Sequence, residues 1–336
     1  MKLKIFLALL VIPIVFSCGR KDRFHINTTQ NKTEVKIQRF DRDLIQSDTT
    51  NFNSSVKKLY INYPVFLQTF ISNMDTVSPQ DTLAVARVLK NFVTFPQVKN
   101  VNEQVLAVFA DVADIENEIS VAYTYLKHYF PTLPTPEVYF FVSGLSRPVM
   151  VDERMKFIGI GSDFYLGADY ELYKAVAYDY MLQNMNPENV SVDVVSTLLF
   201  NYFRFDSKQN RLIDNMLHRG KVMYLLSVFM PERAGKDIMG YSTDQWNWAE
   251  ENESRIWKNM IAQKDLFSSD LQLIRNYLND APFTSPVSQD SPGRLGTWIG
   301  MRIVQCYMKK NKDVTLQRLM QLNDYQQLLE ESGYKP

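Results

Sequence analysis

The stretch SPGRLGTWIGMRIVQCYM, residues 291–308, has the apolar spacing of an amphipathic helix but contains three glycines. A helix places Gly293, Gly296 and Gly300 on one face. Each glycine inside a helix costs about 1 kcal/mol relative to alanine, and the chain has only 12 glycines in 336 residues. We infer that this small-residue stripe lets another helix, or a sheet, approach closely. Its role is then structural, and it pins this helix across the body of the protein.

Helical patterns occupy most of the remaining chain and surround a short region rich in β-branched and aromatic residues. Helices are predicted at 54–73, 80–92, 97–110, 113–129, 170–184, 187–204, 208–230, 243–263, 270–279, 292–311 and 314–331. Strands are predicted at 136–144, 147–152 and 156–167, and 35–45 is predicted as a short strand followed by a turn. The expected fold class is therefore mainly α (α+β), a helical body around a small β-sheet, with residues 35–336 forming a single domain.

The N-terminus has the pattern of an export signal. Lys2 and Lys4 precede an apolar run of 12 residues, IFLALLVIPIVF, which is too short to cross a membrane as a helix. The run ends in VFSC, which resembles a lipobox, the cleavage and acylation signal of bacterial lipoproteins. This predicts a signal peptide over 1–17 and acylation of Cys18. The alternative is an ordinary signal peptide that is cleaved elsewhere, with Cys18 incidental.

Residues 19–34 are polar and lack periodicity, so residues 18–34 are predicted to form a lipidated tether. The acyl chains would attach the protein to a membrane. The segment CGRKDR contains only one acidic residue, too little to argue for export to the cell surface. We therefore expect an outer-membrane lipoprotein that faces the periplasm.

The charge balance and the cysteine count exclude several classes. Lys plus Arg equals Asp plus Glu at 37 each, so no basic excess points to nucleic acid as a partner. Cys306 is the only cysteine besides Cys18, which leaves no internal disulfide if Cys18 is acylated. Cys306 lies on the apolar side of the glycine-bearing helix and is expected to be a buried small hydrophobe.

Catalytic motifs are missing from the sequence. It has three histidines and no HExxH string, which a helical zinc site needs for two imidazoles one turn apart. It has no GxSxG elbow, and GIGSDFYLG (159–167) lacks the GxGxxG pattern and a lysine for phosphate. We expect no catalytic residue, no metal and no cofactor. A metal-dependent peptidase with a non-standard ligand set, such as His218 with Asp193 or Asp214, remains an alternative.

A second alternative comes from DQWNWAEENESRIW (244–257), in which three tryptophans flank an acidic patch. Such a surface would suit a protein partner or a sugar, which predicts a glycan-binding surface lipoprotein. The tryptophans are Trp246, Trp248 and Trp257, and the acidic residues are Glu250, Glu251 and Glu253.

Several strings together resemble the gliding-motility lipoprotein GldB family. They are IQRFDRDL (37–44), IGIGSDFYLGADYELY (158–173), SPGRLGTWIGMRIVQCYMKKN (291–311), the closing ESGYKP and the lipobox cysteine. The resemblance covers essentially the whole mature chain. It implies an envelope lipoprotein that, in gliding bacteria, supports surface motility and the associated protein secretion. Relatives also occur in bacteria that do not glide.

The resemblance further implies a distant relation to zinc peptidases that keep an HExxH helix. The corresponding helices here, 189–203 and 212–229, supply neither the histidine pair nor the glutamate, which implies a degenerate zincin-like metallopeptidase scaffold. The expected function is a non-catalytic envelope lipoprotein that contacts protein partners, whose identity the sequence does not give. A pairing of Arg294 with Asp163 is one hypothesis, and capping of a helix that starts near Tyr170 is the expected role of Asp163 and Asp169. The structural or contact candidates in the resembling strings are Asp163, Tyr165, Gly167, Arg294, Gly296, Trp298 and Gly300.

Overall fold

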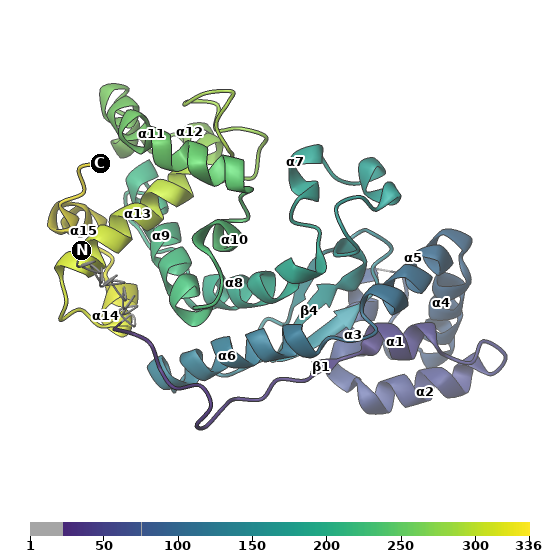
Figure 1. Cartoon of the computed structure of the whole chain (residues 1–336). Helices are drawn as coiled ribbons and strands as arrows, with labels where there is room; N and C mark the ends of the chain where they lie inside the picture. The colour runs from purple at the N-terminus through teal and green to yellow at the C-terminus, as the bar shows by residue number, and fades with distance from the viewer. Residues whose placement is uncertain (1–22, 75) are drawn as a thin grey trace, which may run out of the picture.

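The computed structural model describes residues 23–74 and 76–336. The predicted signal peptide and Cys18 lie outside these residues. The N-terminal part contains β1 (Ile37–Gln38), α1 (Phe40–Ile45), α2 (Phe52–Asn62), α3 (Pro64–Met74), α4 (Thr82–Thr94), α5 (Pro96–Val108) and α6 (Ala113–Tyr129). The middle contains β2 (Glu137–Phe141), β3 (Val149–Val151), β4 (Phe157–Gly161), the 3-10 turns η1 (Ser162–Phe164), η2 (Glu171–Ala175) and η3 (Pro187–Asn189), α7 (Asp179–Leu182) and α8 (Val190–Tyr202). The C-terminal part contains α9 (Leu212–Phe229), α10 (Gly235–Met239), α11 (Thr243–Ala262), η4 (Asp265–Phe267), α12 (Leu271–Leu278), α13 (Leu295–Lys310), α14 (Leu316–Gln321) and α15 (Tyr325–Ser332). The predicted class, mainly α around a small sheet, is confirmed (Figure 1).

The sheet has the strand order β1-β2-β4-β3, and both of its faces are buried. β1, β2 and β4 run parallel, and β3 is an antiparallel edge strand. Alternation along β2 sends Tyr139 and Phe141 to a core with α1–α4, whereas Val138 and Phe140 face the larger C-terminal core. The sheet thus separates two cores, and near-continuous apolar runs suit its strands.

Two long helices, α9 and α13, meet at a glycine contact in the larger core. A Cβ atom added to Gly300 would lie 1.9 Å from the backbone oxygen of Met216, and one added to Gly220 would lie 2.2 Å from the carbonyl carbon of Gly300. Both distances are far below van der Waals contact, so only glycine permits this approach. Gly296 meets α12 instead, where its Cβ would lie 2.8 Å from Leu278 Cδ2. The predicted close approach by another helix is therefore present at both helical glycines.

Gly293 precedes the helix and is not part of its stripe. α13 begins at Leu295, after Arg294 has adopted a left-handed conformation with φ of 58°. The three glycines meet three different neighbours, because a Cβ at Gly293 would lie 2.3 Å from the backbone oxygen of Ala281. The prediction that the helix starts at 292 was wrong, because the left-handed conformation of Arg294 does not belong to an α-helix.

The described part of the expected tether lies against the domain. Phe24 is buried, and its backbone oxygen accepts a hydrogen bond of 2.8 Å from Tyr129 Oη on α6. The backbone N–H of Thr33 donates to Thr124 Oγ1 on the same helix at 2.9 Å. The segment therefore follows α6 from the region of α14 to β1, as Figure 1 shows.

The segment from 167 to 185, in which one helix was predicted at 170–184, forms η2, α7 and connecting turns. Its ends are joined by a 3.0 Å hydrogen bond from the Gly167 N–H to the Met185 oxygen. The hydroxyl of the buried Tyr173 donates a 2.8 Å hydrogen bond to the backbone oxygen of Asp163. The same hydroxyl accepts a 2.8 Å hydrogen bond from the Leu166 N–H. These hydrogen bonds close residues 167–185 into a loop, which a continuous helix could not form.

The predicted helix at 54–73 is also divided, into α2 and α3, where Pro64 starts the second helix.

No helix in the described ranges has both the length and the apolar character that crossing a bilayer requires.

Substituting Gly300→Ala tests the helix contact. Alanine favours a helix by about 1 kcal/mol over glycine, but its methyl group would overlap the Met216 backbone. We expect the overlap to dominate and to lower the free energy of unfolding by about 2 kcal/mol or more. Urea unfolding of the variant measures this, with Gln305→Ala on the same helix as the control. An equal or higher stability for Gly300→Ala would contradict the close approach.

Candidate functional site

A cavity of about 460 Å³ lies between the 167–185 loop and the helices α8, α9, α10 and α13. This volume is within the range of small-molecule sites. In Figure 1, the loop that carries α7 stands above α8 and faces α10. Two of the resembling strings reach the cavity, 158–173 through Tyr165 and 291–311 through Arg294. Local sequence patterns do not predict this cavity, because residues from eight separate elements and the loops between them line it.

Tyr165 and Asp193 form one side of the cavity. The Tyr165 hydroxyl donates a 2.7 Å hydrogen bond to Asp193 Oδ2. Burial raises the pKa of Asp193 to about 6, while the Tyr165 hydrogen bond and the charge of Arg294 oppose this rise. Burial also raises the pKa of Tyr165, which keeps its hydroxyl protonated as the donor. The pair therefore presents an acid that gains a proton at mildly acidic pH.

Arg294 lies across the cavity and is fixed by two contacts. Its Nε is 3.0 Å from Asp280 Oδ1, and its Nη2 donates to the backbone oxygen of Met239. The hypothesis that Arg294 pairs with Asp163 was wrong. The left-handed conformation at Arg294 ends the preceding loop, and the nearby Asp280 at the end of α12 supplies the carboxylate.

Asp163 is fully buried and holds the turn after β2. Its Oδ2 accepts from the N–H groups of Ser143 at 3.0 Å and Leu145 at 2.7 Å. Burial raises the pKa of Asp163 to about 6, and these hydrogen bonds oppose the rise. The prediction that Asp163 and Asp169 cap a helix at Tyr170 was wrong, because Asp163 binds the 143–145 turn and η2, which begins after Tyr170, receives no side-chain cap.

Arg219 on α9 is a cavity residue that the sequence analysis missed. Its Nη1 donates to the backbone oxygen of Leu278 at 2.6 Å. Among the residues that the structure describes, no carboxylate lies within ion-pair distance of its guanidinium. Burial lowers the pKa of Arg219, and the positive charge of Arg294 lowers it further, whereas Asp280 opposes the shift. The signal that could have found Arg219 is its position directly before Gly220 in a largely apolar helix.

The other candidates from the resembling strings have structural roles. Trp298 is fully buried, with its ring 6.2 Å from that of Trp246 in an edge-on arrangement. Gly167 has φ of 112° and closes the 167–185 loop. Thr297, which the analysis also missed, lines the cavity, and its buried hydroxyl has no hydrogen-bond partner among the described side chains and backbone.

The residues around the cavity do not fit a zinc ion. α8 contributes Val192, Asp193 and Ser196 to the wall, and none of these is an imidazole. Within 23–74 and 76–336, no three His, Cys, Asp or Glu side chains are close enough together to hold one metal. The histidine of the alternative ligand set, His218, packs edge-on to the ring of Phe205 at 5.3 Å. Burial lowers its pKa to about 4.

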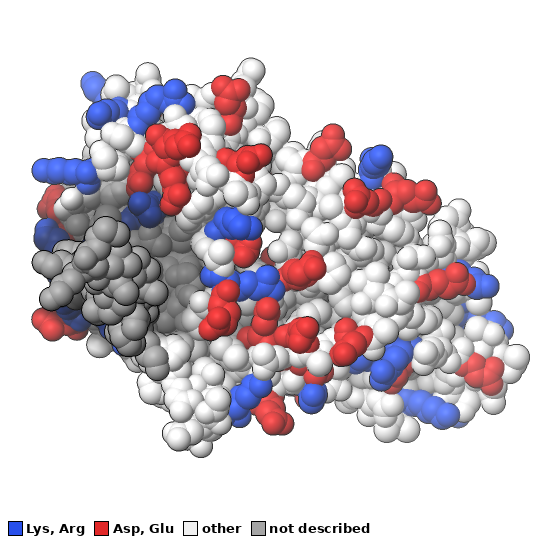
Figure 2. Space-filling model, viewed as in Figure 1, with Lys and Arg blue, Asp and Glu red and all other residues white. Residues whose placement is uncertain are grey.

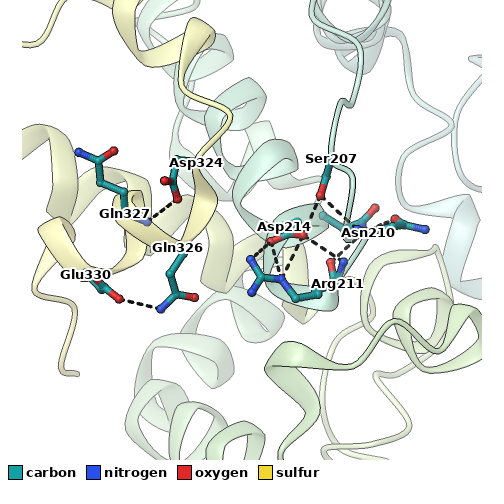
Figure 3. Close-up of polar contacts among 9 residues, drawn as sticks. Ser207, Asn210, Arg211, Asp214, Asp324, Gln326, Gln327 and Glu330 are labelled. Atoms are coloured by element: carbon teal, nitrogen blue, oxygen red, sulfur yellow. Dashed lines mark hydrogen bonds and ion pairs between the residues drawn. The ribbon is translucent and has the colours of Figure 1, made fainter.

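Asp214, the other part of that ligand set, caps its own helix. Its carboxylate accepts from Arg211 Nη2 at 2.8 Å and from Ser207 Oγ at 2.8 Å. Figure 3 shows both side chains converging on Asp214, with Gln326 and Glu330 paired on the facing helix α15. The hollow between these elements, about 530 Å³, is lined mostly by polar residues, of which Ser207, Arg211 and Asp214 bind one another.

The three tryptophans of the predicted surface are partly buried. Trp246, Trp248 and Trp257 all pack against the larger core. Glu253 accepts from Arg302 Nε at 2.9 Å and from the Tyr334 hydroxyl at 2.8 Å. The core and these contacts thus cover part of the predicted surface, and the three rings are only partly exposed. Figure 2 shows acidic and basic side chains interspersed over the visible face.

Substituting Asp193→Asn tests the buried acid. A carboxyl whose pKa rises from 3.8 unfolded to about 6 folded binds its proton more tightly in the folded state. The wild type therefore loses stability as pH rises through this interval, by up to about 3 kcal/mol. We expect Asp193→Asn to be more stable than wild type at pH 7.5 by about 1–3 kcal/mol and nearly equal at pH 4. Thermal unfolding at both pH values measures this, with the exposed Asp169→Asn as the control. A difference independent of pH would contradict the assignment.

Comparison with known proteins identifies the family. The family model described as gliding motility protein GldB matches residues 21–336. No curated protein and no solved structure matches this chain, so the zincin-like scaffold stays a prediction. The matched range includes the sheet, both cores and every residue of the cavity. The chain therefore belongs to the gliding motility protein GldB family.

Proposed function

We propose that this protein is a non-catalytic lipoprotein of the cell envelope that supports motility or secretion machinery by contacting an envelope protein. Membership of a gliding-motility family supports the association with motility. The observation that carries the non-catalytic part is the composition of the cavity. Three carboxylates line it, and each already has a partner: Asp193 accepts from Tyr165, Asp237 contacts Lys236 and Asp280 contacts Arg294.

The docked N-terminal segment supports a short connection to the membrane. Arg23 Nη2 donates to the backbone oxygen of Val314 at 3.2 Å, and Cys18 precedes Arg23 by five positions. Five residues span at most about 18 Å. If Cys18 is acylated, the loop after α13 is held near the bilayer. The exposed Lys309, Lys310 and Lys312 in this region suit an anionic lipid surface.

The proposed location is the outer membrane, with the domain facing the periplasm. We expect wild type to fractionate with the outer membrane and Cys18→Ala to be lost from the membrane fraction, because it lacks the acyl anchor. Density-gradient fractionation measures this, and Cys306→Ala is the matched control, since it removes the other cysteine. Membrane attachment of Cys18→Ala equal to wild type would contradict lipidation at this site.

Metal content and complementation test the non-catalytic role. The full lipoprotein, produced with zinc present and then dialysed, is expected to hold well below one zinc per chain by elemental analysis. In a cell whose own copy is deleted, Asp193→Asn is expected to restore function as wild type does, since a scaffold needs no ionised acid there. One tightly held zinc per chain, or loss of function in Asp193→Asn at normal protein level, would contradict the proposal.

A further inference from the structure

The cavity combines two guanidinium groups with an apolar wall. Arg219 and Arg294 come from α9 and α13, and Asp280 is the only carboxylate within ion-pair distance of either in the described ranges. We propose that this cavity binds an organic anion, a carboxylate or phosphate group carried on a short apolar body. The assignment stands on the cavity alone and does not depend on the lipid anchor or on the contact with an envelope protein.

The charges around the cavity leave Arg219 without a counter-ion. Asp280 is largely exposed, with 66% of its side-chain surface accessible, and its contact is to Arg294. Asp237 contacts Lys236 at 3.0 Å. Neither carboxylate is within ion-pair distance of Arg219, whose guanidinium is half-buried beside a second cation. An anion bound between the two arginines would neutralise both positive charges. It would also accept hydrogen bonds from the Arg219 N–H groups that do not bind the Leu278 oxygen.

The acids of the cavity argue against a cationic ligand. Asp280 and Asp237 have basic partners, and Asp193 accepts from Tyr165. A cation would have to compete with Arg294 and Lys236 for these carboxylates. Binding of an anion by Arg219 breaks no ion pair among the described residues.

The opposite wall is apolar and part of it is exposed. Val176 and Met181 on the 167–185 loop line the cavity while 48% and 41% of their surfaces remain accessible. Exposed apolar side chains beside a cavity favour a ligand that covers them. The apolar lining also includes Phe164, Met185, Phe200, Met223 and Met239. The ligand is therefore an anion with an apolar body and not an inorganic ion.

Four probes of matched length distinguish the charges. They are hexanoate, monohexyl phosphate, the uncharged hexanamide and the cationic hexylamine, each titrated to about 10 mM because ligands of this size bind weakly. The protein is the full lipoprotein in an uncharged detergent, and binding is measured by calorimetry. We expect hexanoate or monohexyl phosphate to bind at least tenfold more tightly than hexanamide, and hexylamine to bind no better than hexanamide. The stronger of the two anions identifies the anionic group.

Variants of Arg219 locate the site. Arg219→Gln is expected to remove the preference for the anion over hexanamide. Arg219→Lys keeps the charge without the planar fork, so it should bind the anion severalfold more weakly yet retain the preference. Arg233→Gln, outside the cavity and paired with Glu118, should bind as wild type does. A melting curve of each variant verifies folding, and Arg219→Lys keeps the test decisive if Arg219→Gln does not fold.

Three results with the wild-type protein would overturn the proposal. They are equal binding of hexanoate, monohexyl phosphate and hexanamide, tighter binding of hexylamine, and no binding of either anion at the highest concentration. Retention of the full anion preference in folded Arg219→Gln would also overturn it, because the recognition would then lie elsewhere.

Discussion

The backbone contact between α9 and α13 is the constraint on which the rest of the structure depends. Where Gly220 meets Gly300, no side chain separates the two helices. This closeness positions Arg219, one residue before the contact, and Thr297, three residues before it on the other helix, at the wall of the same cavity. A larger residue at either glycine would separate the helices and displace both side chains. The glycines therefore shape the cavity without lining it.

The sequence indicated the close approach but not its partner. Three glycines in an otherwise helical pattern predicted a tight contact because each is locally unfavourable. The partner, Gly220, lies 80 positions earlier in the chain, and nothing local marks the pairing. The same limit explains why the partner of Arg294 was predicted wrongly. Asp163 and Asp280 are both carboxylates that an arginine could bind, and only the folded structure shows that Asp280 is the one in contact with Arg294. Local sequence patterns likewise could not predict the strand order of the sheet.

Local periodicity misled at the loop beside the cavity. Residues 170–184 have a spacing of apolar residues that suits a helix, but Tyr173 uses its hydroxyl to bind the backbone of 163–166. Long-range bonds of this kind outweigh a weak local propensity. Among the candidates from the sequence, Tyr165 and Arg294 line the cavity, whereas Asp163, Gly167, Gly296, Trp298 and Gly300 support the surrounding fold. Arg219 and Thr297 were missed because the cavity that they line forms only when α9 and α13 pack together in the fold.

Native-state hydrogen exchange tests the central claim that the α9–α13 contact holds the fold together. Amides near the glycine contact, in 216–220 and 300–304, should exchange only through global unfolding, with the highest protection in the chain. Amides of α2–α4, which belong to the smaller core, should exchange at lower free energy. If the amides at the contact open before those of α2–α4, the contact is not the constraint that holds the fold, and the account of the cavity fails with it.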